Sequence, residues 1–246
     1  GGAADRRPRD PAPAWRHGAR LNINSDLGEG AGADDAILPS IDSASVACGV
    51  HAGSASTAIA TALRCVELGL EVGAHPGYDD RANFGRIETG LAPDAIEALV
   101  AFQVSGLAAV VPIAFVKPHG ALYRRCQLDP AAADAVARVA KAHRVGLLGQ
   151  PGTELLAAAR RAGIPAFREG FADRKLLPDG NLAPRSEPGA VLEPDAAAEQ
   201  ALRLAQSGGF DSICIHGDSP GAAQVAAAVR KALGELGVET GPLAGR

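Results

Sequence analysis

Four histidines lie close to the ends of short apolar stretches that are typical of buried β-strands. They are His51, His75, His119 and His216, whereas His143 lies near the end of an alanine-rich helical stretch. In a parallel barrel or a doubly wound sheet, the loops after the carboxyl ends of the strands meet on one face and build the active site. Histidine exchanges protons near neutral pH. The four histidines therefore predict one shared site.

Charged side chains follow the same expected strands. They are Asp26, Glu29, Lys117, Glu169, Asp173, Arg174 and Asp218. Imidazole together with carboxylate suits either proton transfer or a zinc-like ion. The candidate metal ligands are Asp26, His51, His75 and His119. No HxxH, HxxxH or HExxH pair places two ligands on one element, so the sequence leaves the presence of a metal open.

Two common nucleotide-binding motifs do not account for the glycines near the start of the chain. Residues 28–33, GEGAGA, fit the spacing GxGxxA, but Pro39 leaves too little room for the helix that this motif requires. Asp26 and Glu29 would also repel a pyrophosphate. The chain has no GxxxxGKS or GxxxxGKT phosphate loop. A nucleotide would therefore need another kind of site.

Several further residues each have two interpretations. Cys48 is either a nucleophile near His51 or a small buried thiol that packs. Asp173 and Arg174 form either an ion pair within a loop or part of a substrate site. Arg185 is either solvated or binds a carboxylate through its planar fork of N–H groups.

Short apolar stretches alternate with longer helical ones from residue 21 onward, which is typical of βα units that build a parallel sheet. The expected strands span residues 21–24, 43–47, 70–74, 114–117, 145–148, 166–168 and 212–215. The expected helices span residues 54–68, 93–110, 130–143, 152–162, 194–206 and 220–236. Gly120 is expected to turn the chain into a loop, with Arg124 and Arg125 on the surface. We predict an α/β fold with seven strands and one domain over residues 21–246.

Composition excludes several classes of function. The 246 residues carry a net charge of −4, which argues against a nucleic-acid partner. No apolar run reaches the roughly 18 residues of a membrane span. Four cysteines without CxxC spacing favour a reducing, cytoplasmic setting. Residues 1–20 carry five arginines and three prolines but no apolar core of a secretory signal, so we expect a disordered or processed tail.

Eight short motifs follow one another along the chain. They are NSDLGEG (24–30), ACGVHAG (47–53), GAHPGY (73–78), FGR (84–86), VKPHGALY (116–123), FADR (171–174), PRSEPGA (184–190) and ICIHGDSPGA (213–222). Together they resemble the LamB/YcsF family from residue 21 to about residue 238. The resemblance implies a seven-stranded (β/α) TIM-like barrel similar to that of polysaccharide deacetylases.

The resemblance also implies a function. It implies one component of an ATP-dependent 5-oxoprolinase that acts with two partners, the B and C subunits. Together the subunits would open 5-oxo-L-proline (pyroglutamate) to L-glutamate while ATP, a co-substrate, becomes ADP and phosphate. A divalent metal is compatible with this function.

The chemistry of such a reaction suggests roles for the strand-end residues. A five-membered lactam is a poor electrophile, and phosphorylation of its amide oxygen would open it to attack by water. Lys117 is then expected to stabilise developing negative charge, with Asp26 and His119 in proton transfer. His51, His75 and His216 would orient the substrate or bind a metal. The candidate substrate-binding residues are Glu29, Arg86, Asp173, Arg174, Arg185 and Asp218.

Two other functions stay open on the sequence. One is a stand-alone metal-dependent deacetylase or amidohydrolase on the same barrel, active without ATP. The other is a non-catalytic subunit that binds 5-oxoproline or a partner and positions it.

Overall fold

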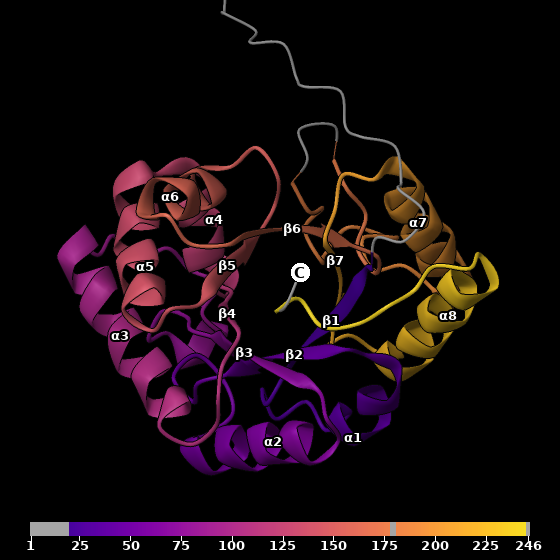
Figure 1. Cartoon of the computed structure of the whole chain (residues 1–246), viewed down its shortest axis with the longest axis horizontal. Helices are drawn as coiled ribbons and strands as arrows, with labels where there is room; N and C mark the ends of the chain where they lie inside the picture. Colours follow the sequence, from indigo (N-terminus) through magenta and orange to yellow (C-terminus); the bar gives the residue numbers. More distant parts are fainter. Residues whose placement is uncertain (1–19, 178–180, 245–246) are drawn as a thin grey trace, which may run out of the picture.

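Seven parallel strands close into a barrel in the order in which they occur along the chain (Figure 1). The computed structural model describes residues 20–177 and 181–244, so the expected tail lies outside the described residues except for Arg20. The strands are β1 (Asn22–Leu27), β2 (Ser43–Ala47), β3 (Glu71–His75), β4 (Phe115–Val116), β5 (Gly146–Gly149), β6 (Ala166–Phe171) and β7 (Ser212–His216). The predicted seven-stranded (β/α) barrel is confirmed.

Helices surround the barrel and cover its outer face (Figure 1). They are α1 (Asp34–Ile37), α2 (Ala55–Glu67), α3 (Pro93–Ala108), α4 (Gly120–Leu128), α5 (Pro130–Ala142), α6 (Glu154–Ala162), α7 (Pro194–Ser207) and α8 (Ala222–Glu235), with short 3₁₀ turns at Leu38–Ser40 and Arg81–Asn83. Proline is the first residue of α3, α5 and α7, where its fixed φ and missing N–H suit the first turn. None of the described helices is long and apolar enough to cross a membrane.

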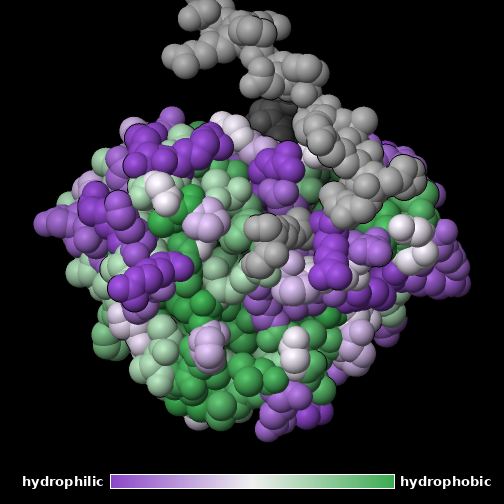
Figure 2. Space-filling view, viewed as in Figure 1, coloured by the Kyte–Doolittle hydropathy of each residue, from purple (hydrophilic) through white to green (hydrophobic). Residues whose placement is uncertain are grey.

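The outer surface is not uniformly polar. Ile59, Leu63 and Val66 of α2 are each at least 40% exposed, and their spacing places them on one side of the helix. Figure 2 shows hydrophobic residues gathered in the lower part of the face in view, around α2, and hydrophilic residues along the upper rim.

Part of the interior of the barrel is polar, in contrast to the apolar layers that usually fill such barrels. On β1, Asn22 accepts hydrogen bonds from the hydroxyls of Ser43 and Ser212, at 2.9 and 2.6 Å. Asn24, two residues on, donates to Ser212 at 2.8 Å and to Glu169 of β6 at 3.1 Å. Because side chains alternate along a strand, Asn22, Asn24 and Asp26 all point inward. The polar interior therefore leads from the bottom of the barrel up to the strand ends.

The C-terminal segment closes the bottom of the barrel, where the strands begin. The N–H groups of Leu243 and Ala244 donate to the Glu71 carboxylate at 2.7 and 2.6 Å. The Leu243 side chain is 1% exposed and packs with Phe115 and Leu148. In Figure 1 this end of the chain lies near the barrel axis. The carboxyl ends of the strands, at the opposite end, therefore border the pocket described below.

The region after β4 differs from the sequence-based expectation. Residues 120–128 form helix α4 where we expected a loop, and Arg124 and Arg125 lie on this helix. Gly120, at φ +52°, begins the helix, and a Cβ there would lie 2.7 Å from the carbonyl oxygen of Gly85. The glycine is thus needed for a close approach between two loops as well as for its backbone angle.

Removing the Leu243 side chain should destabilise the barrel. We expect Leu243→Ala to lower the free energy of unfolding by about 2 to 4 kcal/mol, because it leaves a cavity beside Phe115 and Leu148. Leu236→Ala, at a side chain that is 45% exposed, should change it by less than about 0.5 kcal/mol. Urea denaturation followed by circular dichroism measures both. Equal effects would show that the C-terminal segment does not close the core.

Candidate active site at the strand ends

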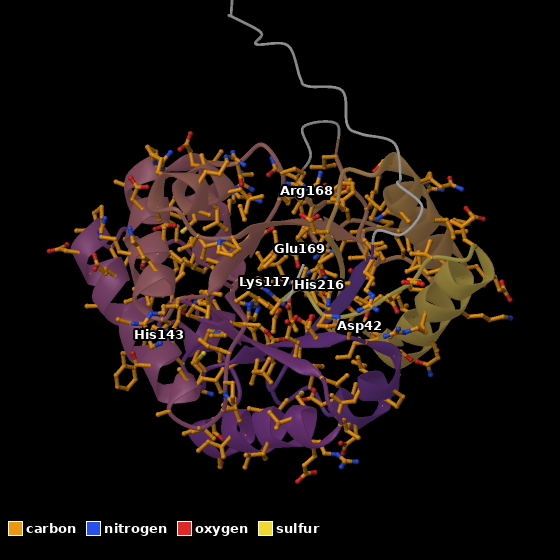
Figure 3. The ribbon with its side chains drawn as sticks, viewed as in Figure 1. Asp42, Lys117, His143, Arg168, Glu169 and His216 are labelled. Carbon is orange, nitrogen blue, oxygen red and sulfur yellow. The ribbon has the colours of Figure 1, made fainter. Side chains whose placement is uncertain are left out.

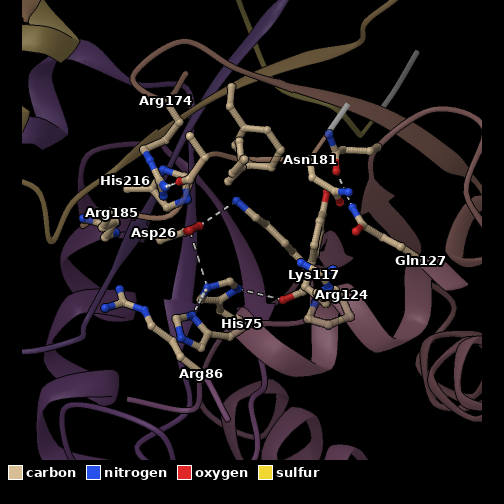
Figure 4. Close-up of a pocket in the computed structure, with 18 of the residues that line it drawn as sticks. Asp26, His75, Arg86, Lys117, Arg124, Gln127, Arg174, Asn181, Arg185 and His216 are labelled. Carbon is tan, nitrogen blue, oxygen red and sulfur yellow. Dashed lines mark hydrogen bonds and ion pairs between the residues drawn. The ribbon is translucent and has the colours of Figure 1, made fainter. Parts of the chain in front are cut away.

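A pocket of about 400 Å³ opens at the carboxyl ends of the strands. Its walls include residues at the ends of strands β1, β3, β6 and β7 and residues of the loops after β3, β4, β5 and β6 (Figure 4). The lining residues used below are Asp26, His75, Arg86, Lys117, His119, Tyr123, Arg124, Phe171, Arg174, Arg185 and His216.

Lys117 lies between two carboxylates inside the barrel. Its Nζ is 2.8 Å from Asp26 Oδ1 and 2.8 Å from Glu169 Oε1, and it also contacts Asn24 Oδ1 at 3.3 Å. Figure 4 shows the lysine and Asp26 pointing toward each other across the pocket floor. Burial alone would lower the pKa of Lys117, but Asp26 and its other anionic neighbours raise it well above its ordinary value. The lysine therefore stays charged.

The two carboxylates respond differently to the shared lysine. Burial would raise the pKa of Asp26, but His75 and Lys117 lower it below its ordinary value. Burial raises the pKa of Glu169 despite Lys117. Because one cation serves two buried acids, we assign the full negative charge to Asp26. Glu169 is held by hydrogen bonds from Asn24 and from the Tyr123 hydroxyl, each 3.1 Å long.

Three histidines and Glu29 form a second cluster beside Asp26. Glu29 Oε1 lies 3.3 Å from His51 Nε2 and 3.4 Å from His119 Nδ1. His119 Nδ1 lies 3.0 Å from His75 Nε2, and the rings of His51 and His119 stack at 3.9 Å. Burial lowers the pKa of His51 to about 4, that of His119 to about 3, and that of His75 well below its ordinary value. All three imidazoles are therefore neutral near pH 7.

His216 and Asp173 form a third group on the other side of the pocket. His216 Nδ1 is 3.0 Å from both carboxylate oxygens of Asp173, and the His216 backbone N–H donates to the same carboxylate at 3.1 Å. The ring stacks on Phe171 at 5.5 Å. Burial would lower the pKa of His216, but Asp173 raises it above its ordinary value. Because Asp173 holds Nδ1–H, the other ring nitrogen faces the pocket and carries a proton when the ring is positively charged.

Arginines line the outer part of the pocket. Asp218 accepts from Arg86 at 2.5 Å and from Arg185 at 2.6 Å, so these two cations share one carboxylate. Arg174 donates to the backbone carbonyls of Ala183 and Ala190, at 2.5 and 3.2 Å. The mouth of the pocket is therefore cationic and suits an anionic group of a ligand.

The sequence-predicted site residues lie around one end of the barrel. Figure 3 places Lys117, Glu169 and His216 near the barrel axis and His143 among the outer helices, where it contacts Ser105 at 3.1 Å. Asp173 does not form the loop ion pair that was one interpretation, because it binds His216. Burial raises the pKa of the Cys48 thiol to about 12, which disfavours Cys48 as a nucleophile. Arg124, expected beyond the site, lies at the rim of the pocket although it is exposed.

Three residues with direct contacts to the charged centre were not identified from the sequence. Tyr123 was missed because helix α4 was read as a loop. Cys214 contacts Lys117 Nζ at 3.1 Å but lies inside a strand, as does Asn24. The polar residues Asn22, Asn24 and Asp26 at every second position of this strand were the signal that could have found the polar part of the interior.

Replacing Lys117 by methionine should destabilise the fold at pH 7. We expect a loss of about 3 to 5 kcal/mol, because Asp26 and Glu169 would be buried without a cation. In this variant the pKa values of both carboxyls rise above their unfolded values, so the loss is largest at high pH and shrinks as the pH falls from 7 to 5.

Urea denaturation of wild type and variant at both pH values measures this effect. Lys141→Met, at an exposed lysine in the last turn of α5, is the matched control. A loss that does not depend on pH would show that the lysine contributes only its packing.

The barrel occurs in solved structures with little sequence similarity to this chain. A family 4 carbohydrate esterase from Streptomyces lividans matches with a TM-score of 0.55 and 12% identity, over 92% of this chain and 94% of that one. A peptidoglycan deacetylase from Bacillus subtilis matches with a TM-score of 0.53 and 14% identity, over 96% of this chain and 90% of that one. At these identities the likeness shows a shared fold alone.

Other relatives are much more similar. The crystal structure of a lactam utilization protein from Thermus thermophilus has a TM-score of 0.80 and 39% identity, over 90% of this chain and 99% of that one. A Mycobacterium avium (strain 104) protein, named as the A subunit of 5-oxoprolinase, is 41% identical over 90% of this chain and 98% of its own length. The sequence model of the LamB/YcsF family matches residues 21–246. The chain therefore belongs to the LamB/YcsF family.

Proposed function

We propose that this chain is the A subunit of an ATP-dependent 5-oxoprolinase, which opens 5-oxo-L-proline to L-glutamate while ATP becomes ADP and phosphate. The names of the Mycobacterium and Thermus relatives support this proposal. The observation that carries it is the charged Lys117, held by Asp26 on the floor of a pocket of small-molecule size. We propose that the chain acts with the B and C subunits in the cytoplasm, where ATP is available.

The chemistry accounts for the use of ATP. Transfer of the γ-phosphoryl group to the lactam oxygen gives ADP and turns that oxygen into a leaving group. Water then adds to the ring carbon, the C–N bond breaks, and the nitrogen takes up a proton to give an acyl phosphate. A second water releases phosphate and leaves the new carboxylate. These steps require a cation near the developing charge, a base for water and an acid for nitrogen.

The pocket offers a residue for each requirement. Lys117 is the cation, and Asp26, hydrogen-bonded to it, is the base for water. For the acid we propose His216, because its pocket-facing nitrogen is free while Asp173 fixes the other. Both ring nitrogens of His119 have partners, at His75 and at the Phe84 carbonyl, which makes it less suited to proton transfer.

The substrate carboxylate has its own binding region in this proposal. Arg185 and Arg174 lie at the mouth of the pocket, and the guanidinium fork matches a carboxylate. Arg86 and Asp218 hold Arg185 in place through the shared ion pair. Glu29 lies behind His119 and is not among the residues that line the pocket, so we place it outside the substrate-binding set.

The reaction is tested by reconstituting the chain with its partner subunits and measuring glutamate released from 5-oxoproline with and without ATP. We expect turnover only with ATP and partners, and a fall in kcat of about 100-fold to 1,000-fold in Lys117→Ala. Lys141→Ala should keep full activity. Full-rate turnover by this chain alone without ATP would indicate a stand-alone amidohydrolase. Unchanged rates in both Lys117→Ala and His216→Gln would indicate a subunit that only binds substrate.

The role of His216 as an acid predicts a specific pH dependence. An acid must be protonated, so activity should fall as the pH rises through the pKa of His216, which Asp173 raises. Asp173→Asn removes that effect, and the alkaline fall in kcat should begin at lower pH. Asp195→Asn, at an exposed position in the first turn of α7, should leave the profile in place. A lower rate with an unmoved profile would assign Asp173 a purely structural role.

A further inference from the structure

The tautomers of two histidines are determined by carbonyl groups behind them. His75 Nδ1 lies 2.7 Å from the backbone oxygen of Lys117, and His119 Nε2 lies 2.8 Å from that of Phe84. A carbonyl oxygen only accepts hydrogen bonds, so both of these nitrogens carry the ring proton. The remaining nitrogens, His75 Nε2 and His119 Nδ1, therefore both present lone pairs.

These two lone pairs face each other. His75 Nε2 and His119 Nδ1 are 3.0 Å apart, which is hydrogen-bond distance, yet neither neutral ring has a proton to place between them. Two buried acceptors at this distance repel unless a cation or a hydrogen-bond donor lies beside them. Histidines that bind metals show this pattern, because each donates its second N–H to a carbonyl or carboxylate.

Glu29 and His51 complete a ring of four ligand atoms. Glu29 Oε1 is 3.4 Å from His119 Nδ1, 4.0 Å from His75 Nε2 and 3.3 Å from His51 Nε2. All four ligand atoms lie within 4.8 Å of one another. In a tetrahedral zinc site with bonds of about 2.0 to 2.1 Å, the ligand atoms are roughly 3.3 to 3.4 Å apart. The four separations given for this cluster, from 3.0 to 4.0 Å, lie around this value.

The protein supplies little positive charge to this cluster. The ion pairs that the described residues form with Glu29 involve imidazoles, and Lys117 is already shared by Asp26 and Glu169. Glu29 is 7% exposed. Burial raises the pKa of Glu29 to about 8, so near pH 7 this group either holds a proton or is matched by a cation.

We infer that Glu29, His51, His75 and His119 bind one divalent ion of the zinc class in tetrahedral geometry. Three imidazoles with one carboxylate suit such an ion better than Mg²⁺ or Ca²⁺, which prefer oxygen ligands. The sequence analysis named Asp26 as a candidate ligand. Because Lys117 already balances the charge of Asp26, we place Glu29 in the ligand set instead. This inference does not depend on the lactam reaction.

The site is closely packed and joins four separate strand ends. The ligands follow β1, β2, β3 and β4, so one ion would link four loops. Gly77 and Gly85 lie directly against His51, since a Cβ at either position would approach its side chain to 2.7 or 2.8 Å. A four-ligand shell without an open position is typical of zinc sites that stabilise a fold. His75 and His119 line the pocket, which provides the route of entry.

Metal binding by the full chain tests the inference directly. After dialysis against a chelator, Zn²⁺ is titrated in by calorimetry, and bound metal is counted by elemental analysis. We expect one Zn²⁺ per chain and a higher Tm when the ion is present, because it binds the folded state. With Co²⁺ in place of Zn²⁺, we expect the strong visible absorption of a tetrahedral complex. No binding, or the weak spectrum of six-coordinate Co²⁺, would overturn the inference.

Variants test the ligand set. Glu29→Gln and His119→Gln should each weaken Zn²⁺ binding by about 100-fold or more, since loss of an outer partner alone costs about 10- to 100-fold. His143→Gln removes an imidazole outside the cluster and should bind as the wild type does. Asp26→Asn should keep one Zn²⁺ per chain. Tight binding in Glu29→Gln together with its loss in Asp26→Asn would assign the ion to Asp26 instead.

Discussion

The ammonium group of Lys117 sits between Asp26 and Glu169 inside a closed barrel, and much of the site depends on this one charged contact. Removing charged groups from water is costly unless each is paired and its remaining hydrogen-bonding capacity is satisfied. The barrel meets this requirement with a polar interior. Asn24 contacts both the lysine and Glu169, and Tyr123 reaches Glu169 from helix α4.

This use of the lysine determines what the neighbouring groups can do. Lys117 contacts Asp26 and Glu169, whereas Glu29 lies among the neutral imidazoles of His51, His75 and His119. Asp173 in turn is taken by His216, and Asp218 by two arginines. Apart from Asp26 and Glu169, which share Lys117, the acids named here thus have different partners. The result is three groups of side chains in one small region: Lys117 with its two carboxyl groups, the imidazoles around Glu29, and the His216–Asp173 pair.

The same scaffold occurs in carbohydrate esterases and peptidoglycan deacetylases at 12 to 14% identity. A parallel barrel brings loops from all strands to one end, whatever side chains those loops carry. The fold therefore explains why the residues meet, and the residues explain the chemistry. In this chain the C-terminal segment covers the other end of the barrel, where Leu243 packs against Phe115 and Leu148. The polar side chains of the interior are therefore reached from the pocket end.

Much of the fold was predictable from the sequence because it depends on local pattern. Alternating apolar and helical stretches predicted seven strands near their observed positions, and histidines after four of them indicated one site. Helix α4 was missed because Gly120 and the loop-like sequence before it suggested a turn. That Glu29 lies together with His51, His75 and His119 was also beyond the sequence.

The sequence by itself thus determined which residue types stand at the strand ends, since strand and helix periodicity are local properties of the chain. Only the tertiary structure decided how those residues pair. Lys117 and Asp26 are 91 positions apart, and their contact exists because barrel closure places β4 across from β1. The tautomers of His75 and His119 likewise depend on carbonyl groups that only folding brings behind them.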